Sequence, residues 1–241
     1  MKIFVAGAGG VIGRRLVPLL REAGHSVVGT TRSTDRAEAL RLLGAEPVVV
    51  DVFDAEVLTR AVVAAAPDVV IHQLTDLPAA PGTPGFDESR SRNSRLRIEG
   101  TANLMAAAKA AGVRRVIAQS VAFSYAQSGK PHVETDKLAA APDNEPYSTV
   151  RGVTALENAV TGTSGVEGIV LRYGYLYGPG TWNETQKPVP PSLHVDAAAH
   201  AALLAITKGQ PGIYNIAEDG DAVSSEKAKR ELSFDAGFRS R

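Results

Sequence analysis

Residues 2–13 read KIFVAGAGGVIG, and this stretch decides the fold. Lys2–Ala6 is typical of a buried strand, and Gly7, Gly10 and Gly13 follow it at the spacing of a turn that crosses a bound pyrophosphate. Such a turn needs a tight bend, bare backbone against the phosphate oxygens and close packing of the next helix, and glycine permits all three. Apolar residues then recur at helical spacing, at Ile12, Leu16, Leu19 and Leu20. Because a helix that begins here points its free N–H groups at the phosphate, the segment predicts a dinucleotide-binding turn.

Short β-rich runs alternate with helical patterns along the rest of the chain. The expected strands are Ser26–Thr31, Pro47–Asp51, Val69–Gln73, Val116–Ser120 and Gly168–Arg172. The expected helices are Arg36–Leu43, Ala55–Ala66, Leu96–Ala111, Val153–Thr161 and a short one at Ser224–Leu232. Two segments rich in proline and glycine are expected as surface loops near the strand ends, Leu77–Phe86 and Gly178–Pro191. This alternation predicts an α/β fold with a doubly wound parallel sheet.

Length and composition fit one globular domain of 241 residues, 44% of them apolar. We expect a single dinucleotide-binding domain over residues 1–241, with a small substrate-covering part formed by about 174–193 and 217–241. Basic and acidic residues each number 26, so the net charge favours neither nucleic acid nor an anionic membrane as a partner. The chain has no cysteine and its five histidines are scattered, which indicates no metal site. Without a signal peptide or a membrane-spanning run, a cytoplasmic location is expected.

Five further segments share the order and spacing of a known family. They are Asp68-Val-Val-Ile-His72, Arg114-Arg-Val-Ile-Ala-Gln-Ser120, Leu171-Arg-Tyr-Gly-Tyr-Leu-Tyr-Gly-Pro-Gly180, His194-Val-Asp196 and Gly212-Ile-Tyr-Asn-Ile216. With the glycine turn, they make the chain resemble the extended short-chain dehydrogenases/reductases, the NAD(P)-dependent epimerases, dehydratases and reductases that often act on nucleotide sugars. The resemblance implies a Rossmann-like fold, a nicotinamide cofactor and a small-molecule substrate. It also implies a homodimer formed through Leu96–Ala111 and Val153–Thr161, and it leaves His194 the role of anchoring a loop.

The end of the second strand favours NADP as the cofactor. An NAD site usually offers a carboxylate to the adenosine ribose there, whereas this chain has Arg32 between hydroxyl residues, which suits a 2′-phosphate. Asp35 keeps NAD possible, and Asp51-Val52 resembles the family's adenine-contacting pair. The candidate cofactor-binding residues are Gly7, Gly10, Val11, Ile12, Gly13, Thr31, Arg32, Asp51, Val52, Gln73 and Leu74.

The catalytic pattern of the family is incomplete. Relatives use a tyrosine as acid or base, a lysine four residues later that lowers its pKa, and a serine or threonine that binds the substrate oxygen. Here Tyr147 has Arg151 four residues later, and Ser120 is the candidate hydroxyl. Many relatives also carry a glutamate eight residues after the tyrosine. Alignment on Glu157 instead places Thr149 at the tyrosine position and Val153 at the lysine position, so two alignments stay open.

Four arginines lie close together in the chain just after the expected loop Leu77–Phe86. Arg97 stands three residues before Gly100-Thr101, a position at which relatives often have asparagine. The four arginines of this region, Arg90, Arg92, Arg95 and Arg97, could clamp an anionic substrate group or form a solvated helix face.

These features support two functions. The first is an NAD(P)-dependent oxidoreductase or epimerase-like enzyme that moves hydride between nicotinamide and a carbonyl or secondary alcohol, with Tyr147, Arg151 and Ser120 in catalysis. The second is a sensor or regulator that binds NADP(H) but has lost the chemistry, favoured by Arg151 and Arg97.

Overall fold

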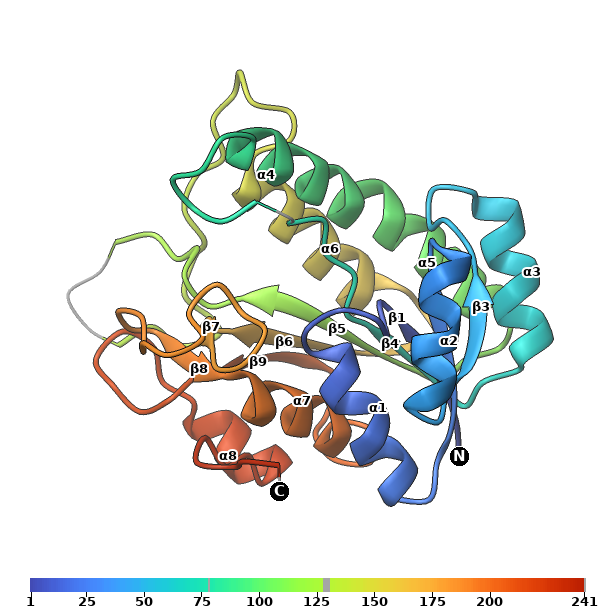
Figure 1. Cartoon of the computed structure of the whole chain (residues 1–241). Helices are drawn as coiled ribbons and strands as arrows, with labels where there is room; N and C mark the ends of the chain where they lie inside the picture. Colours follow the sequence, from blue (N-terminus) through green and yellow to red (C-terminus); the bar gives the residue numbers. More distant parts are fainter. Residues whose placement is uncertain (78, 128–130, 241) are drawn as a thin grey trace.

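A computed structural model describes residues 1–77, 79–127 and 131–240, and it has one large parallel sheet. The sheet has seven strands in the order β3-β2-β1-β4-β5-β6-β9. Their bounds are β1 Lys2–Ala6, β2 Ser26–Thr31, β3 Glu46–Val49, β4 Val69–His72, β5 Arg115–Val121, β6 Glu167–Tyr173 and β9 Gly212–Ile216. All neighbouring pairs are parallel, so the predicted doubly wound fold is confirmed (Figure 1).

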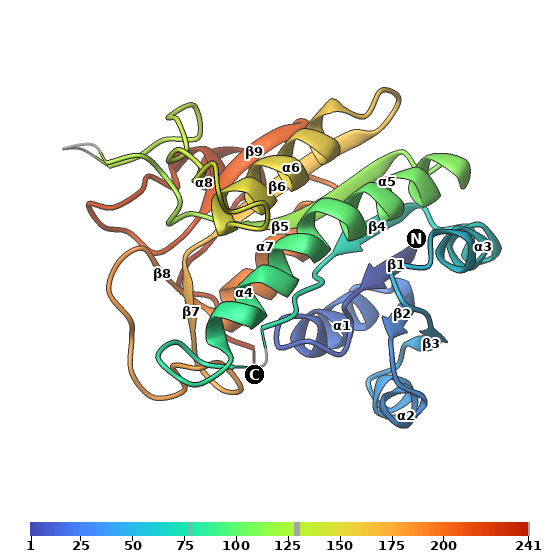
Figure 2. The same ribbon diagram turned by 90° about the horizontal axis from the view of Figure 1, so that it is seen from above.

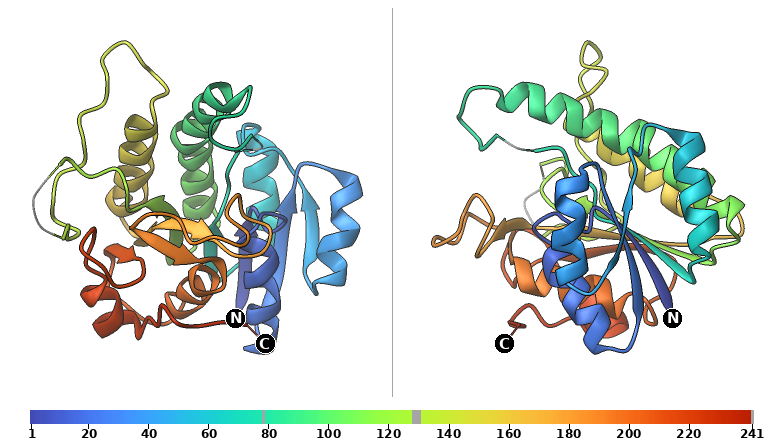
Figure 3. Two further views of the ribbon diagram at one scale, coloured as in Figure 1. Left: turned by 60° about the vertical axis from the view of Figure 1, so that its left-hand side comes forward. Right: turned by 45° about the vertical axis from the view of Figure 1, so that its right-hand side comes forward.

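Helices cover both faces of the sheet. They are α1 Gly13–Glu22, α2 Thr34–Leu42, α3 Ala55–Ala65, α4 Phe86–Arg95, α5 Thr101–Ala110, α6 Thr149–Gly162, α7 Val195–Leu204 and α8 Glu226–Leu232. A π-helical turn, η1 (Leu96–Gly100), joins α4 to α5. Figure 2 shows α4 and α5 following one another over one face with α6 beside them, and Figure 3 shows α7 and α8 on the other face.

Two cores follow from the alternation of side chains along each strand. On β1, Ile3 and Val5 pack with α1, α7 and α8, whereas Phe4 and Ala6 pack with α3, α5 and α6. Because both faces are covered, the central strands are apolar at nearly every position, as expected for a parallel sheet.

Several boundaries differ from the sequence expectation. Helix α6 begins at Thr149 rather than at residue 153, because the Ser148 hydroxyl caps it by accepting a hydrogen bond from the Arg151 N–H. Helix α4 was not expected, because its sequence is polar and charged and shows no clear apolar stripe. The expected helix Leu96–Ala111 is broken at its start by η1.

The carboxyl ends of β6 and β9 lead into the remaining structure. Residues 175–177 (β7, Tyr175–Tyr177) pair with β8 (Ser192–His194) as a separate two-stranded ribbon. The loop between them contacts the start of α4, where the rings of Trp182 and Phe86 meet edge to face at 5.9 Å. The two Pro/Gly-rich loops therefore meet, apart from residue 78 of the first loop, which lies outside the described residues.

Neither a membrane span nor a metal-binding cluster is found in the described part of the chain. No helix there is long and apolar enough to cross a bilayer, and no three acidic or histidine side chains gather as metal ligands. The predicted dimer stays a prediction.

Candidate active site and cofactor cavity

The glycine turn between β1 and α1 is built as its sequence requires. Gly7 has a φ of +89°, and a Cβ there would lie 2.6 Å from the carbonyl oxygen of Gln73. A Cβ at Gly13 would lie 2.4 Å from the carbonyl oxygen of Gly7, so only glycine lets α1 start this close to the strand. Gly10 closes the turn by donating its N–H to that same Gly7 oxygen at 3.0 Å.

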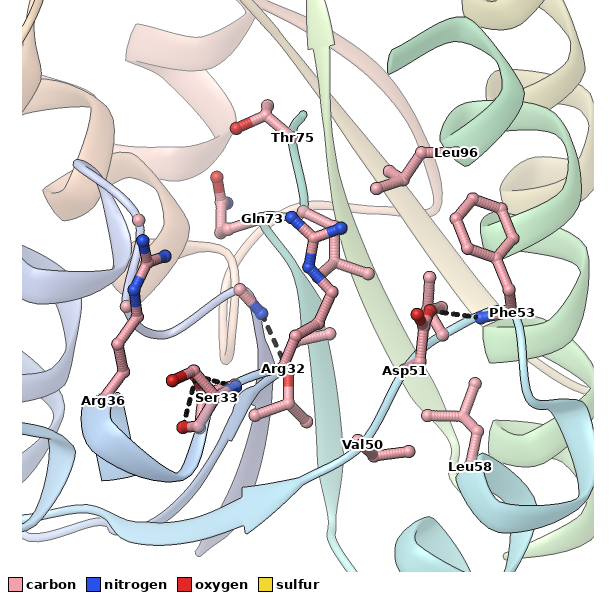
Figure 4. Close-up of a pocket in the computed structure, with 18 of the residues that line it drawn as sticks. Arg32, Ser33, Arg36, Val50, Asp51, Phe53, Leu58, Gln73, Thr75 and Leu96 are labelled. Carbon is pink, nitrogen blue, oxygen red and sulfur yellow. Dashed lines mark hydrogen bonds between the residues drawn. The ribbon is translucent and has the colours of Figure 1, made fainter. Parts of the chain in front are cut away.

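A cavity of about 530 Å³ opens beside this turn, at the carboxyl ends of β1, β2 and β4 (Figure 4). It lies where the strand order reverses, the place where open α/β sheets bind nucleotides. The cavity wall includes most of the predicted cofactor-binding residues: Gly7, Gly10, Thr31, Arg32, Asp51, Val52, Gln73 and Leu74. Val11, Ile12 and Gly13 do not line it, because Ile12 and Val11 pack into the core and Gly13 lies beneath the turn.

Sequence reasoning missed several residues of this wall. Arg36 faces the cavity together with Arg32, and the spacing of the two arginines at the end of β2 is a signal that could have found it. Asp35, which the sequence indicated as the residue that keeps NAD possible, also lines the cavity. Phe53 and Leu96 add apolar surface, and their roles depend on how α3 and η1 pack. Arg32 lies 3.8 Å from Asp76 in an exposed ion pair, which leaves its guanidinium accessible.

A buried polar network occupies the carboxyl ends of β5 and β6. The Glu157 carboxylate of α6 accepts hydrogen bonds from Arg172 Nε at 2.8 Å and from Arg172 Nη2 at 2.6 Å. Ser120 Oγ also donates to it, at 2.7 Å. Arg172 Nη1 donates to the Tyr125 hydroxyl, which in turn donates to the Asn215 side chain. These bonds join α6 to β5, β6 and β9 and to the loop that follows β5.

The predicted catalytic residues do not come together. Tyr147 precedes α6, is 38% exposed, and donates its hydroxyl to Glu99 at 3.0 Å. The Arg151 guanidinium donates to the carbonyls of Glu145 and Pro142. Within the described residues, no hydrogen bond joins Tyr147, Arg151 and Ser120 to one another. Their catalytic role stays a prediction that this geometry does not favour.

Helical phase explains this separation. Residues 149, 153 and 157 lie four apart and share one face of α6, whereas positions 147 and 151 are offset from that face by about 200°. Glu157 faces Ser120 and Arg172, so that face is turned toward the strand ends. Val153 is fully buried there.

The tyrosines and His72 near the site are held in their neutral forms. Burial raises the pKa of Tyr125, against the opposing charge of Arg172, and it raises the pKa of Tyr173. The hydrogen bond to the Glu99 carboxylate raises the pKa of Tyr147. Burial, assisted by the charge of Arg97, lowers the pKa of His72 to about 4. None of these tyrosines has the lowered pKa that a catalytic phenol needs.

Comparison with known proteins identifies the family. A model described as the NAD dependent epimerase/dehydratase family matches residues 3–193. The chain belongs to this family.

Relatives of this epimerase/dehydratase chain include reductases and dehydrogenases. It is 41% identical over 247 residues to a 3-diazoavenalumate denitrifying reductase of Streptomyces sp, covering 94% of this chain and 79% of the relative. It is 30% identical to a 3 beta-hydroxysteroid dehydrogenase/Delta 5-->4-isomerase of Mycobacterium tuberculosis, over 74% of this chain and 48% of that one.

Solved structures share the fold. UDP-glucose 4-epimerase of Thermotoga maritima superimposes with a TM-score of 0.77 at 21% identity, covering 99% of this chain and 94% of that one. The dTDP-glucose 4,6-dehydratase of Streptomyces venezuelae gives a TM-score of 0.77 at 18% identity, covering 99% and 93%. The resemblance read from the motifs is therefore confirmed, and NAD(P) is the cofactor expected for this family.

The cavity fits that cofactor. Gly9 and Gly10 present bare backbone to it, and a Cβ at Gly9 would meet nothing within 4 Å. The buried Gln73 Oε1 has no hydrogen-bond partner among the described residues, so it is available to a ligand. Gly7, Gly9 and Gly10 would hold the pyrophosphate. Arg32 and Arg36 would hold a 2′-phosphate, and Asp51 and Val52 the adenine.

A second cavity, also of about 530 Å³, lies beyond the carboxyl ends of β5 and β6. Phe123 and Tyr175 stack against each other on its wall at 4.1 Å, and each is more than one third exposed. Tyr125 and His132 form a second stacked pair there, at 4.6 Å. The wall is completed by residues 189–191 and 221–223, from the two regions expected to cover the substrate. This cavity is an aromatic site next to the strand ends that carry Ser120 and Arg172.

Proposed function

We propose that the chain is a nicotinamide-dependent reductase of an aromatic diazo compound, and that its hydride transfer is not coupled to a tyrosine proton donor. The observation that supports this proposal is the face of α6 that carries Glu157, because it also carries Thr149 and Val153, the residues that alignment on Glu157 places at the family's tyrosine and lysine positions.

The chemistry of the hydride acceptor explains how a reductase can work without the family's tyrosine and lysine. Hydride addition to a carbonyl leaves charge on oxygen, and a positioned acid commonly speeds the reaction by about 10²–10⁴. An aryl diazonium carbon that accepts hydride forms a C–H bond and breaks its C–N bond, and the C–N electron pair leaves with N₂. No proton enters this step.

The relatives support the same choice of substrate. The Streptomyces reductase, 41% identical over most of this chain, carries a diazo substrate and the loss of nitrogen in its name. A bound nicotinamide supplies the hydride from its C4. This chain's own residues supply the aromatic cavity, in which the stacked pair of Phe123 and Tyr175 offers an aromatic surface to a planar ring.

The test measures cofactor oxidation and product together. The purified protein is mixed with NADPH or NADH and a hydroxyaryl diazonium salt, with a protein-free reaction to correct for spontaneous decomposition. We expect NAD(P)H oxidised, N₂ released and arene formed in equal amounts. A panel of ketones and nucleotide sugars, run in parallel, should show little turnover.

Tyr147→Phe separates the two alignments. Because the Tyr147 hydroxyl bonds an exposed glutamate rather than Ser120, we expect kcat/KM for the diazonium salt to stay within about twofold of the wild type. A loss of about 100-fold or more, together with ketone turnover by the wild type, would restore Tyr147 as the proton donor.

The sensor function, which Arg151, Arg97 and the open alignment of α6 favour, is the alternative. It predicts tight binding of NADP(H) with no oxidation of the cofactor by any diazo, carbonyl or sugar substrate. Stoichiometric arene formation would remove it.

A further inference from the structure

Arg97 is a buried guanidinium without a bonding partner. The residue is 5% exposed, it lies in the π-helical turn η1, and its Nε makes no hydrogen bond in the described part of the chain. Nor does any salt bridge to it occur among the described residues. Burial lowers the pKa of Arg97 to about 10, with Glu157 opposing the change, so the side chain is charged at neutral pH.

The neighbouring arginines differ from it. Arg90 pairs with Asp87, Arg92 with Asp76 and Arg95 with Glu99, and all three side chains are about half exposed. They form the solvated helix face, and Arg97 alone turns inward. The sequence allowed either a solvated helix face or a clamp for an anion. Arg90, Arg92 and Arg95 match the first interpretation, and Arg97 is the candidate for the second.

Charge counting around Arg97 leaves one buried positive charge uncompensated. Arg97 and Arg172 are cations, and Glu157 is the buried carboxylate that interacts with both charges. Glu157 is already bonded twice to Arg172 and once to Ser120. His72, which also feels the charge of Arg97, is held neutral. An unpaired charge in the protein interior is costly unless a partner arrives, so this cluster is complementary to an anion.

Arg97 follows a residue of the cofactor cavity in the chain and interacts electrostatically with groups at the ends of the sheet strands. Leu96, the residue before it, lines the cofactor cavity. Its electrostatic neighbours are His72, at the end of β4, and Glu157, which is bonded to Ser120. Alignment on Glu157 places the fully buried Val153 at the family's lysine position, so in that alignment the family's own cation is missing here.

We infer that Arg97 binds an anionic oxygen of the substrate, a ring carboxylate or phenolate, and so selects ionised aromatic substrates. This inference rests on the proposed reductase function for its choice of ligand. A planar guanidinium donates paired hydrogen bonds to such an oxyanion. It therefore acts as a specificity-determining residue in place of the missing lysine.

The test compares an aryl diazonium carboxylate with its methyl ester in the wild type, Arg97→Met and Arg97→Lys. Arg90→Met, which removes an exposed arginine close by, is the matched control. We expect the wild type to prefer the carboxylate by about 30-fold in kcat/KM, as a charge-assisted hydrogen bond in a buried site provides. Arg97→Met should lose the preference through KM, Arg97→Lys should keep part of it, and Arg90→Met should keep all of it.

A binding measurement keeps this inference separate from the reductase proposal. Calorimetry of the NADP⁺-loaded protein with 4-hydroxybenzoate and with its methyl ester needs no turnover. We expect Arg97→Met to weaken binding of the carboxylate about tenfold or more and to leave the ester and NADP⁺ unchanged. Its melting temperature should equal or exceed that of the wild type, since an unpaired buried charge has been removed.

The two measurements test the role of Arg97 and the proposed reaction separately. Unchanged carboxylate preference in folded Arg97→Met, or in Arg97→Lys should the methionine variant not fold, overturns the role of Arg97. A wild type that binds the carboxylate through Arg97 but reduces no diazo compound overturns the proposed reaction and leaves the anion site standing.

Discussion

His72 shows at the scale of one residue how burial fixes chemistry. Its Nδ1 accepts the Leu74 N–H at 3.2 Å, so the ring proton lies on Nε2, which is 3.0 Å from the Thr101 hydroxyl. A second proton on Nδ1 would point at the Leu74 N–H, which is itself a donor, so this contact disfavours the charged ring. The side chain is 1% exposed and adjoins Gln73 of the cofactor wall, so this neutral ring helps hold the end of β4 in place.

This arrangement predicts a pH dependence of stability. Burial lowers the pKa of His72 from its ordinary value of 6.5 to about 4 in the folded protein, so between these values the unfolded chain binds more protons. The contribution of neutral His72 to the free energy of unfolding is complete above pH 6.5 and is lost as the pH falls toward 4. Between pH 7 and pH 4.5 we expect the wild type to lose about 2–3 kcal/mol more unfolding free energy than His72→Gln, measured by urea titration. Parallel pH profiles for the two proteins would contradict the assignment.

At the scale of the element, the rotation of helix α6 about its axis decides which of its side chains face the strand ends. Its start at Thr149 and the bonds of Glu157 turn residues 149, 153 and 157 to the strand ends and leave Tyr147 outside the helix. The pair Glu157–Arg172 holds this phase, because it joins α6 to β6 with both side chains at most 5% exposed. Arg97, Ser120 and Tyr125 all depend on the same carboxylate, directly or through Arg172.

A double-mutant cycle tests this pair. Glu157→Leu leaves Arg97 and Arg172 buried without a carboxylate, and breaking a buried pair in this way costs about 3–5 kcal/mol. Arg172→Leu should cost less, because Glu157 keeps Ser120 and the nearby charge of Arg97. We expect the double variant to be no less stable than Glu157→Leu alone. Urea unfolding of the four proteins measures the cycle, and additive losses would show that the pair does not act as a unit.

At the scale of the whole molecule, one sheet places two cavities along its carboxyl edge. The first lies beyond β1, β2 and β4 and the second beyond β5 and β6. A hydrophobic core on each face holds the strands that carry both cavities. Ligand binding in either cavity therefore stabilises the fold as a unit, by mass action.

Thermal unfolding with each cofactor tests the preference for NADP. A ligand at 100 times its Kd adds about 2.7 kcal/mol, which corresponds to about 5–10 °C in a domain of this size. We expect a larger shift with NADPH than with NADH at equal concentration, because Arg32 and Arg36 face the cavity. Arg32→Asp should reverse the order, and Arg41→Asp, an exposed change on α2, should keep it. Equal shifts in the wild type, or a larger shift with NADH, would contradict the predicted preference for NADP.

Local patterns predicted much of this fold. The glycine turn, six of the seven sheet strands, most helices and eight residues of the cofactor wall were predicted, because they depend on spacing along the chain, whereas β9 was not predicted as a strand. The polar helix α4, the alanine-rich α7 and the ribbon β7–β8 were not expected, because their stability comes from the surfaces they pack against. The second alignment of α6 was open in the sequence, and the bonds of Glu157 favour it.

The sequence by itself determined the family, the doubly wound sheet and the nucleotide turn, since strand alternation and glycine spacing act over a few neighbouring residues. Only the tertiary structure decided which face of α6 meets Ser120, and that Arg97 turns inward while Arg90, Arg92 and Arg95 stay in solvent. Helical phase and burial depend on contacts between residues far apart in the chain, and no local pattern carries that information.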